Sequence, residues 1–175
     1  VEEDTVDFPE NYRADLVSGG DDALIEEAAD LLASAERPAI IVDDGARWSM
    51  GDDAAAVAEL SDYLKIPVGV SGSNCRGLFG NEFENPLLRT NAMGRADVLV
   101  TLGCRFDFRL GSGNGIPKDA KVIQVHTDMH QIGFNVRADI GILGSTGAVT
   151  KNILARVKEK RNPKADAPWT GEPKP

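Results

Sequence analysis

Short apolar runs alternate along this chain with longer segments in which apolar residues recur at helical spacing. The runs lack the polar alternation of a half-exposed strand, so they predict buried strands at 38–42, 66–70, 97–102 and 121–125, with a shorter one at 140–143. The periodic segments predict helices at 21–36, 54–64, 88–95 and 146–159. Such alternation predicts a three-layer α/β/α, Rossmann-like fold with an open parallel sheet of about five or six strands.

The predicted helices each have an expected inner side. Asp21 or Asp22 is expected to cap the first helix, and Pro38 to stop it. The inner positions are Leu24, Ile25, Ala28, Leu31, Leu32 and Ala35 in the first helix, Ala55, Ala58, Leu60 and Leu64 in the second, and Val149, Ile153, Leu154 and Val157 in the last. The remaining segments predict loops at 43–53 and 75–84, and the stretch 106–115 is too rich in glycine for a regular element.

Length and composition predict one globular domain. The chain has 175 residues, of which 42% are hydrophobic, enough for a single core. We expect an inter-domain lead-in at 1–20, a central Rossmann-like domain at 21–160, and a proline-rich linker to a following domain at 161–175.

The net charge of the chain makes some classes of binding partner unfavourable. Acidic residues outnumber basic ones 28 to 19, and the net charge of −9 makes nucleic acid or an anionic membrane an unfavourable partner. No apolar run approaches the ~18 residues that a membrane span needs. Two cysteines, Cys75 and Cys104, are too few for a disulfide framework, so a cytoplasmic protein is expected.

Polar residues follow the predicted strands, which places a ligand crevice at one edge of the sheet. Arg47 and Arg105 each follow a small residue just past a strand, where a guanidinium can hold a diphosphate. Ion pairing with Asp43, Asp44 or Asp107 would explain these arginines equally well. Ser145 and Thr146 precede the last helix and either bind an anion or only cap it.

No catalytic or metal constellation emerges from the sequence. There is no Walker-type phosphate loop and no Gly-x-Gly-x-x-Gly after the first strand. His126 and His130 lie four residues apart, but Cys75 and Cys104 belong to different loops, so structural or surface roles are favoured for all four.

Four stretches carry a resemblance to a known family. They are Arg37-Pro-Ala-Ile-Ile41 followed by Gly45-Ala-Arg47; Ile66-Pro-Val68; Ala96-Asp-Val-Leu-Val-Thr-Leu-Gly-Cys-Arg-Phe-Asp107; and Lys121-Val-Ile-Gln-Val125 with Asp128, Ile132-Gly133 and Asn135. In this order the chain resembles the central domain of thiamine-diphosphate-dependent enzymes of the acetolactate synthase and oxalyl-CoA decarboxylase type. The resemblance implies a parent transferase or lyase, a homodimer or homotetramer, with flanking pyrimidine- and diphosphate-binding domains that hold thiamine diphosphate and magnesium.

In some family members the central domain binds FAD or ADP, and the resemblance carries that site to loops after the strands. The implied residues are Gly45, Ala46, Arg47, Gly103, Arg105, Asp107, His126, Thr127, Gln131, Ser145 and Thr146, with Gly144 before them. The chain departs from the family at Asp43 and Asp44, where glycines are common, and at His126, where an acid is common. We therefore expect ADP to bind weakly or not at all and FAD not to copurify.

The resemblance leads to a first hypothesis for function. An excised central domain would be structural and inactive alone, while its parent would act on 2-oxo acids or acyl-CoA relatives. The alternative is a free-standing nucleotide-binding or sensing module of the same fold. An NAD-dependent deacylase fits worse, because neither His126 nor His130 precedes a glycine.

Overall fold

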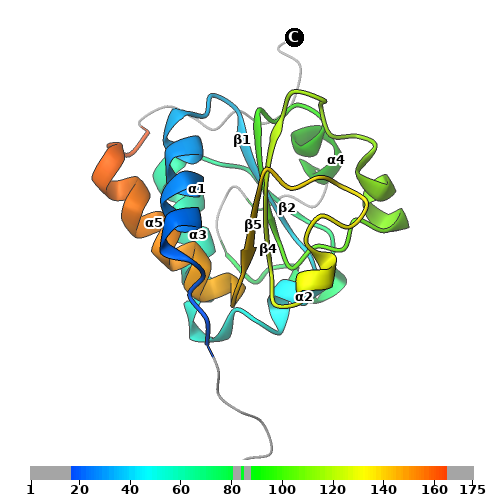
Figure 1. The fold of residues 1–175 in the computed structure, drawn as a ribbon, viewed down its shortest axis with the longest axis horizontal. Coiled ribbons are helices and arrows are strands. Elements are labelled where there is room, and N and C mark those ends of the chain that lie inside the picture. Colours follow the sequence, from blue (N-terminus) through cyan, green and yellow to red (C-terminus); the bar gives the residue numbers. More distant parts are fainter. Residues whose placement is uncertain (1–16, 81–83, 85–87, 165–175) are drawn as a thin grey trace, which may run out of the picture.

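The computed structural model describes residues 17–80, 84 and 88–164 (Figure 1). Its strands are β1 (Pro38–Val42), β2 (Val68–Val70), β3 (Val98–Leu102), β4 (Lys121–His126) and β5 (Ile140–Leu143). Its α-helices are α1 (Asp22–Ser34), α2 (Asp44–Arg47), α3 (Ala55–Leu64), α4 (Leu88–Met93) and α5 (Thr146–Lys160). Four 3₁₀ turns join them: η2 (Gly51–Ala54), η3 (Ser73–Cys75), η4 (Phe108–Gly113) and η5 (Met129–Gln131).

The five strands form one parallel sheet in the order β2-β1-β3-β4-β5. β1 pairs with β2 on one side, placing Ile40 opposite Val68, and with β3 on the other, placing Ile40 opposite Val100. Every residue of β1, β2 and β3 is buried, as their uninterrupted apolar sequences require. This confirms the predicted three-layer α/β/α class with a parallel, Rossmann-like sheet.

The two faces of the sheet are covered by different kinds of structure. α1, α3 and α5 cover one face, to the left of the sheet in Figure 1, and α4 lies across the sheet from them. We call the first the helix face and the second the loop face, because the segments 103–120 and 127–139 complete it. The larger core cluster belongs to the helix face and includes Leu32, Leu60 and Ile153, whereas the smaller one contains Ala92, Phe106 and Leu110.

The helix ends follow their local sequence. Asp21 caps α1, since its carboxylate accepts hydrogen bonds from the backbone N–H groups of Ala23 and Leu24 at 2.9 and 3.2 Å. α3 ends at Leu64 and is capped by Lys65, which adopts the left-handed conformation with φ of 55°. The four inner positions predicted for α5 are all buried.

Four predictions differ from the structure. Pairing of β2 begins at Val68 rather than at residue 66. The Ile66 N–H instead donates to Ser61 O at the end of α3, and Pro67 has no N–H to donate. The predicted loop at 43–53 contains α2 and part of η2, and the stretch 106–115 contains η4, two short turns joined at a kink. Ala55 is exposed rather than inward-facing, while Ala56 and Val57 are buried.

The flanking segments make contacts where they are described. Residues 17–20 pack along α5 and β5: the Ser18 carbonyl accepts from Ser145 N, and the Gly19 carbonyl from Asn152 Nδ2. At the other end, the Arg161 carbonyl accepts from Tyr63 Oη at 2.8 Å and the Lys164 N–H donates to Tyr63 O. The rest of the predicted lead-in and linker, 1–16 and 165–175, lies outside the described residues. Over the part that is described, no helix is long and apolar enough to cross a bilayer.

Candidate functional site

The strand order creates a crevice at the carboxyl edge between β1 and β3. The chain leaves β1 toward β2 on one side, while β3 lies on the other, and such a reversal of strand order is where open α/β sheets bind ligands. A cleft of about 220 Å³ opens there, which we call the switch-point cleft. It is lined by Asp43, Asp44, Gly45, Trp48, Gly103, Arg105, Arg109 and His126.

Two glycines form the base of this cleft by direct backbone contact. A Cβ on Gly45 would lie 2.5 Å from Gly103 O, and a Cβ on Gly103 would lie 2.0 Å from Ala46 N. Gly103 also has a φ of +62°, which L side chains rarely adopt. The two loops therefore close on each other, and glycine is required at Gly103 by both space and backbone conformation.

One guanidinium ties three loop carboxylates together. Arg109 Nη2 lies 3.0 Å from Asp107 Oδ2 and 3.6 Å from Asp43 Oδ2, and Arg109 Nη1 lies 3.2 Å from Asp44 Oδ2. Asp43 is buried, with 1% of its side chain exposed, and also accepts the Asp44 N–H at 2.9 Å. We call these four residues the Arg109 cluster, and it fastens the loop after β3 to the loop after β1.

Hydrogen bonds from Arg109 hold the pKa of Asp107 below its ordinary value, and the same carboxylates raise the pKa of Arg109. The cluster was missed by sequence reasoning. The sequence places Arg109 inside a glycine-rich stretch, and the spacing Asp107-Phe-Arg109 was its only local signal.

His126 lines the same cleft and has a buried, unsatisfied ring nitrogen. The residue is 7% exposed, and its Nδ1 accepts the backbone N–H of Asp128 at 2.9 Å. Burial lowers its pKa, so the neutral ring at pH 7 carries its hydrogen on Nε2. Nε2 is shielded from water and has no hydrogen-bond partner within the described residues.

The N-terminus of α5 is occupied by protein. Ser145 Oγ donates to Ser49 O, and the Thr146 and Ser49 hydroxyl oxygens lie 2.8 Å apart. A Cβ on Gly147 would lie 2.2 Å from Met50 O. Ser145 makes no side-chain cap, and Thr146 is buried against the turn that follows α2.

A second cleft of about 430 Å³ adjoins this end of α5, and we call it the α5-side cleft. It is lined by Val17, Ser18, Trp48, Ser49, Thr127, Leu143, Gly144 and Ser145. Trp48, with 82% of its surface exposed, lines both clefts. Sequence reasoning did not single it out, although it directly follows Arg47 in the first strand-end loop.

The predicted site residues divide into five groups. Gly45, Gly103, Arg105 and His126 line the switch-point cleft, and Thr127 and Ser145 line the α5-side cleft. Ala46 and Thr146 are buried behind the clefts, and Asp107 belongs to the Arg109 cluster. Arg47 and Gln131 line neither cleft: Arg47 is exposed at the end of α2, and the Gln131 side chain bonds to Asp128.

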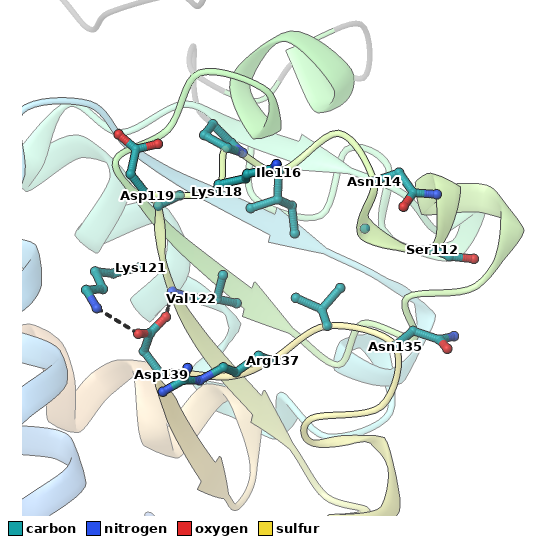
Figure 2. Close-up of a pocket in the computed structure, with 14 residues that line it drawn as sticks. Ser112, Asn114, Ile116, Lys118, Asp119, Lys121, Val122, Asn135, Arg137 and Asp139 are labelled. Carbon is teal, nitrogen blue, oxygen red and sulfur yellow. Dashed lines mark hydrogen bonds and ion pairs between the residues drawn. The ribbon is translucent and has the colours of Figure 1, made fainter.

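A third cavity of about 410 Å³ lies on the loop face, near the start of β4 (Figure 2). Its walls come from 112–114, 116–122, 135–137 and 139. Figure 2 shows the Asp139 carboxylate turned toward Lys121 Nζ, 2.9 Å away, and toward the Val122 N–H, 3.0 Å away. These contacts hold β4 to the segment before β5.

Several groups at this carboxyl edge that could hold a diphosphate are engaged by the protein itself. Diphosphates bind to free N–H groups at a helix N-terminus, but Asp43 accepts the first N–H of α2 and the α5 end packs on Ser49 and Met50. Arg109, the best-placed cation, is already paired with three carboxylates. Only Arg105 remains exposed among the arginines that line the switch-point cleft.

Fold and crevice together define a Rossmann-like α/β domain with the ligand-binding architecture of open parallel sheets. Comparison with known proteins makes this more specific, because the family described as "Thiamine pyrophosphate enzyme, central domain" matches residues 25–153. This range contains every strand and most of α1 and α5. The chain belongs to this family of central domains.

Curated relatives agree with the family assignment. The chain is 33% identical to a probable acetolactate synthase large subunit from Methanocaldococcus jannaschii, over 86% of this chain and 26% of the relative. It is 31% identical to a sulfoacetaldehyde acetyltransferase from Roseovarius nubinhibens, over 88% and 27%. It is 32% identical to an acetolactate synthase from Mycobacterium bovis, over 79% and 24%. The chain thus spans about a quarter of the length of these relatives.

Proposed function

We propose that this chain acts as the central domain of a longer thiamine-diphosphate-dependent enzyme of the acetolactate synthase type. The observation that carries the proposal is the family match over 25–153, which covers the whole sheet. Relatives named acetolactate synthase and sulfoacetaldehyde acetyltransferase support a parent enzyme that acts on 2-oxo acids or related acyl donors.

Within such an enzyme, the role of this domain is structural. The sequence contains neither a Gly-Asp-Gly…Asn stretch for magnesium and diphosphate nor a recognisable cofactor-activating glutamate. The polar side chains at the carboxyl edge support the same role, because the Arg109 cluster holds loops together and leaves no carboxylate of that cluster free as a base. Thiamine diphosphate and magnesium would be held by flanking domains, which are this domain's partners.

The test compares two proteins in one assay. The first is this 175-residue chain, and the second is the product of the complete reading frame that contains it. With thiamine diphosphate, magnesium and pyruvate, we expect carbon dioxide release from the second protein only. Release by the 175-residue chain, or a complete reading frame without thiamine-binding domains, would contradict the proposal.

For the nucleotide, we propose that ADP binds weakly or not at all and that FAD does not copurify. The occupied helix N-termini and the paired Arg109 support this. Should ADP bind measurably, Arg105→Ala should weaken it at least about tenfold, because Arg105 is the exposed cation of the cleft.

A further inference from the structure

His126, which lines the switch-point cleft, has a buried ring nitrogen without a hydrogen-bond partner in the described part of the chain. His126 Nδ1 is committed to the Asp128 N–H, so the neutral ring places its only hydrogen on Nε2. That nitrogen is buried and has no partner among the described residues. A buried donor without a partner lowers the stability of the fold by about 1–3 kcal/mol. An acceptor that reaches Nε2 would remove this loss, and the energy regained would favour binding.

A second donor lines the same cleft. Arg105 lies just past β3 and is exposed, and its guanidinium makes no hydrogen bond or ion pair within the described part of the chain. The positive charge of Arg105 acts on the His126 ring and helps to lower its pKa, so the two groups lie within electrostatic reach. A neutral N–H and a guanidinium that share a cleft favour an oxyanion.

The carboxylates around the cleft are committed elsewhere. Asp43, Asp44 and Asp107 are bound to Arg109. Asp128 lies beside His126 and accepts the His130 N–H at 2.9 Å. These charges reduce the affinity for an anion, yet each is engaged by a donor other than Arg105 or His126 Nε2.

We propose that the switch-point cleft binds a small oxyanion, a phosphate or a carboxylate, through His126 Nε2 and Arg105. The volume of about 220 Å³ suits a small anion. Because Nε2 is shielded, binding includes a small side-chain movement at the cleft wall. This site goes beyond the proposed function, since it requires no nucleotide, no thiamine diphosphate and no flanking domain.

The direct test observes the two histidines. The chain contains only His126 and His130, so a ¹⁵N-histidine-labelled sample gives two sets of imidazole signals. Titration with inorganic phosphate, and separately with acetate, should shift the His126 Nε2 signal in a saturable manner. The exposed His130 serves as the internal reference. A response to only one probe identifies the class of anion.

Matched variants distinguish loss of the Nε2 donor from a general loss of folding. His126→Asn retains an acceptor for the Asp128 N–H but removes Nε2, and should weaken the anion at least about tenfold. His126→Gln retains a donor near the Nε2 position and should lose less. Arg105→Met should also weaken the anion, whereas Arg137→Ala, an exposed arginine at the third cavity, should leave it unchanged.

The affinities of the variants are measured by calorimetry, after thermal melting has shown that each is folded. The proposal is overturned if neither anion shifts His126 at concentrations up to tens of millimolar. It is also overturned if His126→Asn binds as tightly as the parent chain, or if Arg137→Ala loses as much affinity as Arg105→Met. None of these outcomes depends on whether ADP binds or on whether the longer enzyme is active.

Discussion

The helix face and the loop face of the sheet are stabilised by different kinds of contact. On the helix face, α1, α3 and α5 pack repeated apolar positions such as Leu32, Leu60 and Ile153 into one large cluster. The loop face has the short α4 and a smaller cluster, and its loops depend on single contacts such as Asn135 Nδ2 to Phe106 O at 2.9 Å. Apolar residues that recur at helical spacing therefore stabilise the helix face, whereas contacts between individual residues stabilise the loop face and the carboxyl edge of the sheet.

The largest effect should come from a core deletion on the helix face. Leu32→Ala removes a fully buried side chain from α1 and should lower the free energy of unfolding by about 3 kcal/mol. Leu143→Ala is the control, because Leu143 is 49% exposed, and should change it by less than about 0.5 kcal/mol. Urea unfolding measures both, and equal losses would contradict the packing described for the helix face.

At the carboxyl edge, Gly103→Ala should lower the free energy of unfolding by about 2–3 kcal/mol. The added Cβ meets Ala46 N at 2.0 Å and the φ of +62° is unfavourable for alanine. Gly133→Ala separates the two causes, because Gly133 has a φ of +80° and open space around its Cβ position. Its cost should be about 1 kcal/mol in the same unfolding experiment. If both variants lose the same amount, the loops after β1 and β3 are not in close contact.

Removal of the guanidinium should have an intermediate effect that depends on pH. Arg109→Met leaves buried Asp43 without its ionic partner, and because Arg109 is 32% exposed we expect a loss of only about 1–2 kcal/mol at pH 7. The pKa of Asp107 is lowered in the folded state, so its contribution is present above the unfolded pKa near ~4 and is lost as pH falls. The difference between the parent and the variant should therefore shrink in acid.

The control for this experiment is Arg105→Met, which alters an exposed arginine of the same loop outside the Arg109 cluster. Its effect on the free energy of unfolding should stay within about 0.5 kcal/mol at every pH. An Arg109→Met difference that grows as the pH falls would show that the cluster does not stabilise the ionised carboxylates.

The smallest effect concerns the thiols, one in each core cluster. Burial raises the pKa of Cys75 to about 11 and also raises that of Cys104, so at pH 8 only about one Cys75 in a thousand is a thiolate. A charged disulfide reagent should react with neither cysteine in the folded chain and with both after unfolding. Rapid reaction of either thiol at pH 8 would reveal local opening of its face.

The sequence predicted the regular elements well because their periodicity is local. The alternation of apolar runs and helical repeats located all five strands and the inward side of α5 without reference to distant residues. The carboxyl edge was predicted only in part. The order of the strands places Arg105 and His126 in one cleft, but the contact between Arg109 and Asp44 spans 65 residues and has no local signal.

Asp43 and Asp44 show that the charges counted in a sequence can be neutralised by contacts in the folded protein. Their sequence predicts repulsion of a diphosphate, and the structure shows both carboxylates paired with Arg109. Asp43 also accepts the first N–H of α2, so the helix end that could bind a phosphate is already capped. Pairing with Arg109 therefore offsets the charge of Asp43 and Asp44, from which the sequence predicts repulsion.

The measurement that tests this account most directly is a calorimetric comparison of ADP with inorganic phosphate on the 175-residue chain. If the Arg109 cluster and the packed end of α5 occupy the donors that a diphosphate needs, ADP should bind no tighter than phosphate, and the purified protein should be colourless. Micromolar binding of ADP, or a yellow protein with stoichiometric flavin, would contradict the central claim that protein contacts close this crevice to a nucleotide.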